Sequence, residues 1–148
     1  MPAAETTRSA AVLDASVAVR WVVPERGSEE AAALLERPIL WIAPRLMLVE
    51  AASALRRKVS AGELKTEIAV QALAALVDAV ADGTIVLVQD ESFVAAALTL
   101  ALTLGHKLPD CLYLAVAERD GLSLATADGR LDRLARQRGV PTFLVPSA

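Results

Sequence analysis

Four acidic residues stand at positions in the sequence where their carboxylates could act together on one ligand: Asp14, Glu50, Asp110 and Asp128. Asp14 closes a short apolar run that begins at Ala11, and open α/β sheets bind ligands beyond the carboxyl ends of such strands. Asp14 could equally cap the helix that follows it, so it does not assign a function by itself.

Glu50 is surrounded by apolar residues on nearly every side of a predicted helix, with Leu46 and Ala54 one turn away on its own face. A carboxylate in such surroundings is costly unless it is paired or binds a metal ion. It could instead pair with an arginine, or lie at an edge where it reaches water. Because buried ionisable groups gather at functional sites, we favour a functional role for Glu50.

Asp110 and Asp128 both stand near the starts of predicted helices. Pro109 suits the first turn of a helix, and Asp110 follows it near the positive end of the helix dipole. Each of the two aspartates has a simple alternative role as a cap or as a charge in the first helical turn. Asp132, one turn beyond Asp128, is predicted to lie at the surface rather than to act as a spare ligand.

The remaining polar candidates are hydroxyl groups, a histidine and a cysteine. Ser16 and Thr126 each stand two residues from one of the four acids, and their hydroxyls could bond a water or a phosphate oxygen, or cap a helix. His106 is the only histidine, which excludes sites that need two. Cys111 lies in an apolar helix and is predicted to be a packed thiol, although a nucleophilic pair with His106 is conceivable.

Strands and helices alternate along the chain, with helices in excess. Predicted strands cover residues 11–14, 39–42, 85–88, 122–125 and 142–145, and predicted helices cover residues 16–23, 28–35, 45–60, 66–81, 91–104, 109–120 and 128–138. This alternation predicts a three-layer α/β/α fold with a central, mostly parallel sheet of about five strands. We expect residues 1–10 to form a flexible tail and residues 11–148 to form a single domain.

The composition limits the class of protein. The chain has 148 residues, of which 55% are hydrophobic and 3% aromatic, and this apolar surplus suggests a surface that is buried against a partner. Its net charge of −3 gives no general attraction to nucleic acid, so any such contact must come from a local basic patch. A single cysteine excludes an internal disulfide. No targeting segment and no apolar stretch of about 20 residues is visible, which predicts a soluble cytoplasmic protein.

If the four acids converge at one end of the sheet, their charges repel one another and raise their pKa values. Hard divalent cations relieve this repulsion, and ligands that are all oxygen suit Mg²⁺ or Mn²⁺ rather than zinc. Two such ions about 4 Å apart can clamp the attacking and leaving oxygens of a phosphodiester. The acids therefore predict metal-dependent chemistry on phosphate.

Four segments, taken in order, resemble PIN-domain proteins, and the nearest match is to the VapC-type toxin ribonucleases of bacterial toxin–antitoxin pairs. The segments are residues 12–19 around Asp14, 44–56 around Glu50, 106–117 around Asp110 and 125–131 around Asp128. Each motif is weak alone, but the ordered set covers nearly the whole chain. One departure is Gly129, where the family often has arginine.

The resemblance implies an endoribonuclease that uses Mg²⁺, or Mn²⁺ in its place, and leaves 5′-phosphate and 3′-hydroxyl ends. In that case Asp14, Glu50 and Asp110 hold the catalytic metal, and Asp128 helps with a second metal or with the attacking water. Ser16 and Thr126 match the supporting hydroxyl positions, and we name Arg45 and Arg130 as candidate RNA contacts. The resemblance also implies a homodimer and a VapB-type antitoxin whose tail covers the site. The alternatives are an RNA- or protein-binding module that does not cut, and a Mg²⁺-dependent phosphatase.

Overall fold

A parallel sheet of five strands forms the centre of the protein, in a computed structural model that describes residues 9–147. The strands are β1 (Ser9–Leu13), β2 (Ile39–Pro44), β3 (Ile85–Val88), β4 (Ser123–Thr126) and β5 (Thr142–Leu144). Their order in the sheet is β3-β2-β1-β4-β5, and every neighbouring pair is parallel. The predicted parallel sheet of about five strands is confirmed.

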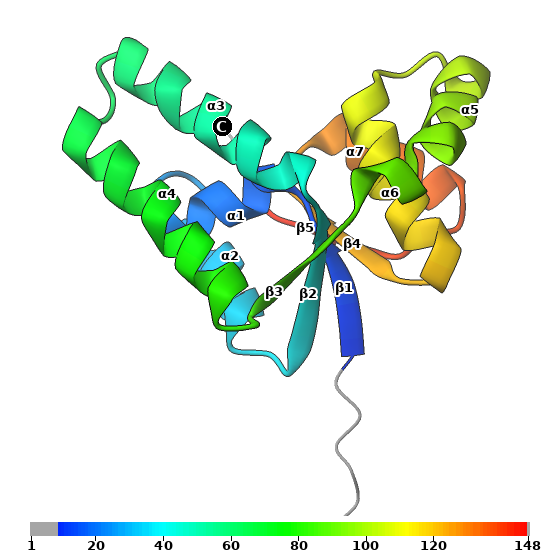
Figure 1. Ribbon diagram of the computed structural model, residues 1–148, viewed down its shortest axis with the longest axis horizontal. Helices are drawn as coiled ribbons and strands as arrows, with labels where there is room; N and C mark the ends of the chain where they lie inside the picture. Colours follow the sequence, from blue (N-terminus) through cyan, green and yellow to red (C-terminus); the bar gives the residue numbers. More distant parts are fainter. Residues whose placement is uncertain (1–8, 148) are drawn as a thin grey trace, which may run out of the picture.

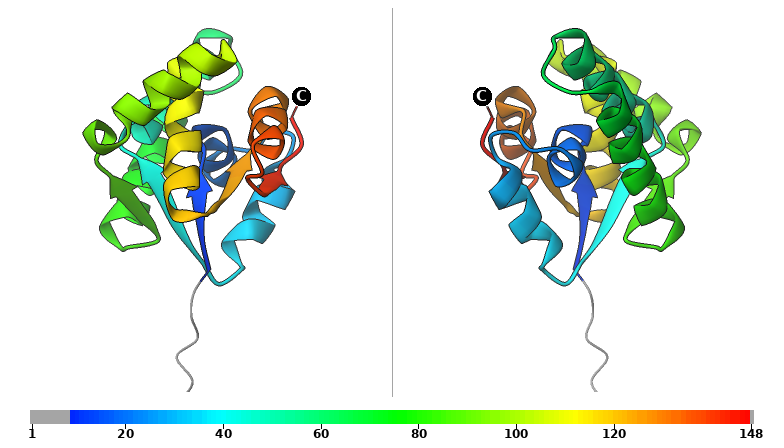
Figure 2. Two further views of the ribbon diagram at one scale, coloured as in Figure 1. Left: turned by 90° about the vertical axis from the view of Figure 1, so that its right-hand side faces the viewer. Right: turned by 90° about the vertical axis from the view of Figure 1, so that its left-hand side faces the viewer.

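Helices cover both faces of this sheet. They are α1 (Ala15–Val22), α2 (Ser28–Leu35), α3 (Leu46–Ser60), α4 (Thr66–Ala81), α5 (Val94–Leu104), α6 (Leu108–Asp120) and α7 (Gly129–Gln137), with a short 3₁₀ turn, η1 (Asp90–Ser92), before α5. Helices α1 to α4 lie on one side of the sheet and α5 to α7 on the other (Figures 1 and 2). The predicted three-layer α/β/α arrangement is therefore confirmed.

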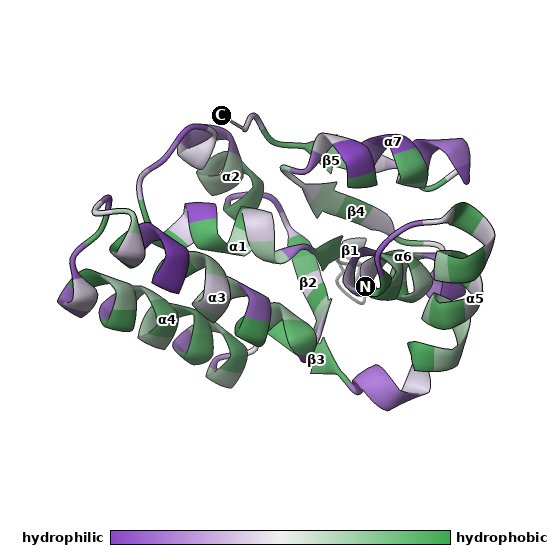
Figure 3. Ribbon diagram, turned by 90° about the horizontal axis from the view of Figure 1, so that it is seen from above, coloured by the Kyte–Doolittle hydropathy of each residue, from purple (hydrophilic) through white to green (hydrophobic). Residues whose placement is uncertain are grey.

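The packing follows from the apolar sequence of the central elements. In β1, Val12 and Leu13 are fully buried, and in α6 every residue from Asp110 to Ala117 is buried. A helix that is apolar on all sides must lie inside the protein, as α6 does between α5 and the sheet. Helix α7 instead alternates hydrophilic and hydrophobic residues, whereas α5 is hydrophobic along most of its length (Figure 3).

The order in which strands are added to the sheet changes side at β1. From β1 the chain adds β2 and then β3 on one side, and it then returns to place β4 on the other side of β1. The junction is tight, because the amide of Asp14 donates to the carbonyl of Ala125 at 3.1 Å. Ligands of open α/β sheets bind at such reversals, beyond the carboxyl ends of the strands.

Several predicted boundaries shift by one to three residues. The first strand begins at Ser9 rather than Ala11, and the rest of the predicted tail, residues 1–8, lies outside the described residues. The helix expected from Glu91 begins at Val94, after η1. No helix among residues 9–147 is both long enough and apolar enough to cross a membrane.

The start of α2 is fixed by a glycine and by a serine hydroxyl. The residue before the helix is Gly27, with φ +92°, and a Cβ at this position would lie 2.2 Å from the carbonyl oxygen of Pro146. Only glycine fits such a close approach with a positive φ. Ser28 closes the preceding turn, because its hydroxyl accepts from the amide of Glu25 at 2.9 Å and donates to the carbonyl of Val23 at 3.1 Å.

Candidate active site

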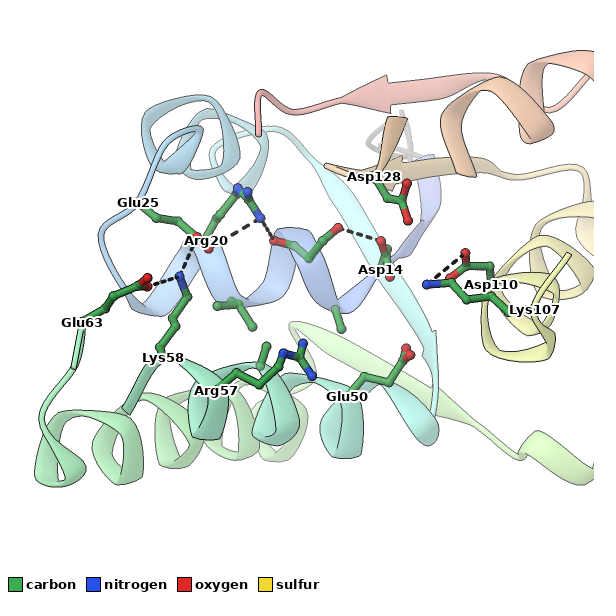
Figure 4. Close-up of a pocket in the computed structure, with 14 residues that line it drawn as sticks. Asp14, Arg20, Glu25, Glu50, Arg57, Lys58, Glu63, Lys107, Asp110 and Asp128 are labelled. Atoms are coloured by element: carbon green, nitrogen blue, oxygen red, sulfur yellow. Dashed lines mark hydrogen bonds and ion pairs between the residues drawn. The ribbon is translucent and has the colours of Figure 1, made fainter. Parts of the chain in front are cut away.

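All four predicted acids line one cavity at the carboxyl edge of the sheet, which we call the carboxylate cavity. Asp14 follows β1, Glu50 lies on α3, Asp110 on the first turn of α6, and Asp128 immediately before α7. Their carboxylates face a common space from four separate elements (Figure 4). With a volume of about 410 Å³, the cavity is large enough to take a small ligand or part of a polymer.

Asp14 is buried, with 6% of its surface exposed, and two hydroxyls hold its carboxylate. Ser16 Oγ and Thr126 Oγ1 both donate to Asp14 Oδ2, at 2.6 and 2.7 Å. Ser16 Oγ also accepts from the amide of Ala127 at 2.9 Å, which links the start of α1 to the end of β4. Asp14 makes no side-chain hydrogen bond to the start of α1, so the capping role that the sequence left open for its carboxylate is not observed. The supporting role of the two hydroxyls stays a prediction.

Burial raises the pKa of Asp14 to about 6. The hydrogen bonds from Ser16 and Thr126 oppose the rise, and the nearby charges of Asp110 and Glu50 add to it. The acids of the cavity therefore interact electrostatically, and a positive charge placed among them would stabilise the ionised forms.

Glu50 is half-buried, and its partner is a tyrosine from the other side of the sheet. The hydroxyl of Tyr113, on α6, donates to Glu50 Oε1 at 2.6 Å. Burial raises the pKa of Glu50 and the charge of Asp110 adds to it, while Lys107 and Arg57 lower it. Burial, together with the charges of Asp14 and Glu50, also raises the pKa of Tyr113, so the phenol remains a hydrogen-bond donor.

Asp110 is buried at the start of α6, beside the only histidine of the chain. His106 Nε2 lies 2.7 Å from Asp110 Oδ2, and Lys107 Nζ lies 3.8 Å from the same oxygen. The histidine thus pairs with Asp110 and not with Cys111, which is fully buried and whose pKa is raised by that burial. The structure gives no support to a nucleophilic pair of His106 and Cys111.

Asp128 combines the two roles that the sequence left open. Its Oδ1 accepts from the amides of Arg130 at 2.8 Å and Leu131 at 3.4 Å, so it caps α7. It also lines the carboxylate cavity. Its own amide donates to Thr126 Oγ1 at 3.0 Å, so the hydroxyl that holds Asp14 also positions Asp128.

Asp132 is a correction to the sequence analysis, which placed it at the surface. It is buried, with 6% exposed, and its Oδ1 accepts from Thr142 Oγ1 at 2.6 Å and from Arg136 Nε at 3.1 Å. These contacts join α7 to β5, away from the residues that line the carboxylate cavity. Asp132 is therefore a structural residue.

The donor set of the cavity fits a hard divalent cation, because every acidic donor is a carboxylate oxygen. In Asp14, Glu50 and Asp110 one oxygen takes the hydrogen bonds given above, and the other takes none from residues 9–147. As the side chains lie, however, no three His, Cys, Asp or Glu residues in this range are close enough together to hold an ion. The oxygens must move closer to share one, and metal binding stays a prediction.

The basic residues of the cavity differ from those we expected. Arg45 and Arg130 are both exposed, but neither lines the carboxylate cavity. The cations that do line it are Arg20, Arg57, Lys58 and Lys107. Helical spacing could have predicted one of them, since Arg57 lies seven residues, or two turns, after Glu50 and is therefore on the same face of the helix. Tyr113 was also missed, because nothing in the sequence links the tyrosine to a residue 63 positions earlier. His106 was considered only as a partner of Cys111, although it lies four residues before Asp110.

Comparison with known proteins relates the chain to one family. A model of the PIN domain matches residues 11–137. Among curated proteins, none matches the chain. The crystal structure of PAE2754 from Pyrobaculum aerophilum is similar with a TM-score of 0.68 and 22% sequence identity, over 91% of this chain and 84% of that one. A toxin–antitoxin complex from Klebsiella pneumoniae contains a chain that is similar with a TM-score of 0.54 and 18% identity, over 82% of this chain and 89% of that one.

Proposed function

Since the family match spans most of its length, this chain belongs to the PIN domain family, and we propose that it is a metal-dependent endoribonuclease of the VapC toxin type. The observation that carries the proposal is the convergence of Asp14, Glu50, Asp110 and Asp128 on one cavity from four elements. Their hydrogen-bond partners support it, because Asp14 and Glu50 are held by hydroxyl groups that do not neutralise them. Among residues 9–147, neither Asp14 nor Glu50 forms an ion pair, whereas Asp110 has Lys107 Nζ 3.8 Å from its Oδ2.

Asp14, Glu50 and Asp110 would hold Mg²⁺, or Mn²⁺ in its place, and Asp128 would help with a second ion or with the attacking water. When bound, the cation would supply Lewis acidity, which makes water a nucleophile near neutral pH and stabilises charge on the phosphate. No side chain needs to attack the phosphate, and the ends left would be 5′-phosphate and 3′-hydroxyl.

The neighbouring residues would fix the acids in place. Ser16 and Thr126 hold Asp14 Oδ2, and Tyr113 holds Glu50 Oε1, so in each carboxylate the remaining oxygen is left for the cavity. Lys107 is exposed at the edge of the cavity, 3.8 Å from Asp110, where its charge can meet an incoming phosphate. Positioning of this kind is how such sites lower the barrier to reaction.

We further propose that the protein acts in the cytoplasm as a homodimer and is inhibited by a VapB-type antitoxin whose tail covers the cavity. Two observations support a partner. The fold is similar to that of a chain in a toxin–antitoxin complex, and Val94, Leu98 and Leu102 form an exposed apolar stripe along α5. Light scattering on the purified protein would test the dimer.

The test of the nuclease is cleavage of a panel of structured RNAs with Mg²⁺, with Mn²⁺ and with EDTA, comparing the wild type with Asp110→Asn. We expect cleavage only by the wild type and only with a divalent cation, with phosphate on the 5′ end of each new fragment. Equal cleavage by both proteins would indicate a contaminating nuclease.

Two other outcomes would each replace the proposal with a different function. RNA that is bound but left whole in the presence of Mn²⁺, to the same extent by Asp14→Asn, would indicate a binding module. Turnover of small phosphomonoesters, with RNA untouched, would indicate a phosphatase.

A further inference from the structure

The carboxylate cavity continues past the acids into a second half that carries most of its positive charge. Arg20, Arg57 and Lys58 line this half, together with Glu25 and Glu63 (Figure 4). A ligand that fills the cavity therefore meets carboxylates at one end and cations at the other.

Most of these cations are already engaged. Arg20 donates to the carbonyls of Ser16 at 2.7 Å and Arg26 at 2.8 Å, and its Nη1 lies 3.5 Å from Glu25 Oε1. Lys58 Nζ lies 2.7 Å from Glu25 Oε2 and 3.9 Å from Glu63 Oε2. These groups tie the loop between α1 and α2 to the end of α3, which is a structural role.

Arg57 is different, because its guanidinium makes no hydrogen bond or ion pair with any residue that the structure describes. It is exposed, it lines the cavity, and its guanidinium points into the cavity from the same face of α3 as the carboxylate of Glu50 (Figure 4). Burial raises the pKa of Glu50, and the charge of Arg57 is among those that oppose the rise. The arginine thus acts electrostatically on the acidic end without being paired to it.

The separation of the two residues suits a polymer. Seven residues of α-helix place Arg57 about 10 Å along α3 from Glu50. Between them on the cavity wall lies Ala54, whose methyl group leaves the path open. A phosphate bound at Arg57 would therefore lie further along the cavity than one among the acids, where it could belong to a neighbouring nucleotide of the same strand.

We propose that Arg57 binds a phosphate of the RNA strand that flanks the reacting phosphodiester. A guanidinium can donate two parallel hydrogen bonds to a phosphate. An arginine with no carboxylate partner breaks no existing ion pair when it binds one. The contact would fix the register of the strand in the cavity. This inference rests on the proposed function, since it takes RNA to be the ligand.

The test compares the wild type with Arg57→Gln, Arg57→Lys and Arg56→Gln in the full chain. Arg56 is the matched control, because it is exposed on the same helix but does not line the cavity. Binding is measured by fluorescence anisotropy in EDTA with the labelled single-stranded RNA of the panel that the wild type binds most tightly. We expect Arg57→Gln to weaken binding about tenfold and to reduce the slope of log K against log salt by about 0.7, the value for one phosphate contact on a single strand.

A second measurement locates the phosphate. The RNA is made with one neutral methylphosphonate linkage at a time, at each position in turn. At one position next to the cleaved linkage, the neutral group should weaken binding of the RNA by the wild type. It should not weaken binding by Arg57→Gln any further, because the neutral linkage and the substitution remove the same contact. Arg57→Lys should retain the salt slope and lose part of the affinity.

Equal binding by Arg57→Gln and the wild type, or an additive effect at every linkage, would overturn the inference. Circular dichroism melting shows whether each variant is folded, and Arg57→Lys keeps the test decisive if Arg57→Gln is not. If the wild type binds RNA with these signatures but cuts none, the nuclease proposal fails and the Arg57 contact stands. If it cuts RNA and the signatures are missing, only the contact fails.

Discussion

Asp14 and Asp132 are buried to the same extent, with 6% of each residue exposed, but they have different neighbours. Two hydroxyls hold Asp14, and Asp110 and Glu50 are the charges that act on it. Asp132 accepts one hydroxyl bond and one bond from an arginine. Arg136 pairs with Asp132 within the fold, whereas no ion pair to Asp14 is present among residues 9–147.

Burial alone therefore does not mark a functional acid in this protein. What distinguishes the two regions is the partner: neutral donors and other acids at the carboxyl ends of β1 and β4, and an arginine at the corner of α7 and β5. The contrast predicts that substitutions at the first region change activity more than stability, and that substitutions at the second do the reverse.

The largest expected effect is on catalysis. If the proposed function holds, Asp14→Asn should lower the rate of RNA cleavage by about a thousandfold, because losing a carboxylate that would hold the cation removes several kcal/mol of transition-state stabilisation. Asp132→Asn should stay within a few-fold of the wild type. Initial rates with Mn²⁺, at a temperature where both variants are folded, test this, and similar losses in the two variants would remove the distinction.

The next effect is on the pH dependence of stability without divalent ions. Because the pKa of Asp14 is raised from 3.8 to about 6, the folded state holds this proton more tightly than the unfolded state. The resulting stability is fully present below about pH 4 and is lost as the pH rises through about 6, at a cost of about 3 kcal/mol. Urea unfolding from pH 4 to pH 7.5 should show this decline in the wild type and a smaller one in Asp14→Asn. An unchanged decline in the variant would contradict the raised pKa.

A smaller loss is expected at the second region. Asp132→Ala removes the acceptor of the Thr142 hydroxyl and one of the two acceptors of Arg136 Nε, and we expect the free energy of unfolding to fall by about 2 kcal/mol. Asp14→Asn at pH 7 should be neutral or stabilising, since it removes a charge that Asp110 and Glu50 repel. Urea unfolding at pH 7 measures both, and a greater loss in Asp14→Asn would reverse the comparison.

The smallest effect tests the hydroxyl partners themselves. Tyr113→Phe keeps the buried ring and removes the 2.6 Å hydrogen bond to Glu50. We expect it to weaken Mn²⁺ binding about tenfold, as found when groups that orient a metal ligand are removed. Calorimetric titration with Mn²⁺ gives the affinity directly. An affinity equal to that of the wild type would mean that Glu50 needs no orientation from the tyrosine.

Much of the fold could be predicted, because short apolar strands alternate with helices that have clear ends. The bounds of α2, α4 and β3 agree with the prediction to the residue. The four acids could be predicted too, since each lies where a strand ends or on a helix that strand order brings to the same edge.

The partners of the acids could not be predicted, because they depend on tertiary contacts. Tyr113 reaches Glu50 from across the sheet. Asp132 is bonded by Thr142, at the start of β5, which lies ten residues further along the chain. Arg45 was named as a candidate RNA contact, but of Arg45 and Arg57 it is Arg57 that lines the carboxylate cavity. Helical spacing from Glu50 would have separated these two.

The strand order has one more consequence, for the stage of synthesis at which the carboxylate cavity can assemble. Everything up to Gly105, where α5 ends, supplies Asp14 and Glu50, whereas Asp110 and Asp128 belong to the portion synthesised afterwards. Because β4 can pair with β1 only when that later portion is present, a nascent polypeptide on the ribosome holds half of its acids and no assembled centre. The four acids can therefore line one cavity only after β4 and the start of α7 have been synthesised.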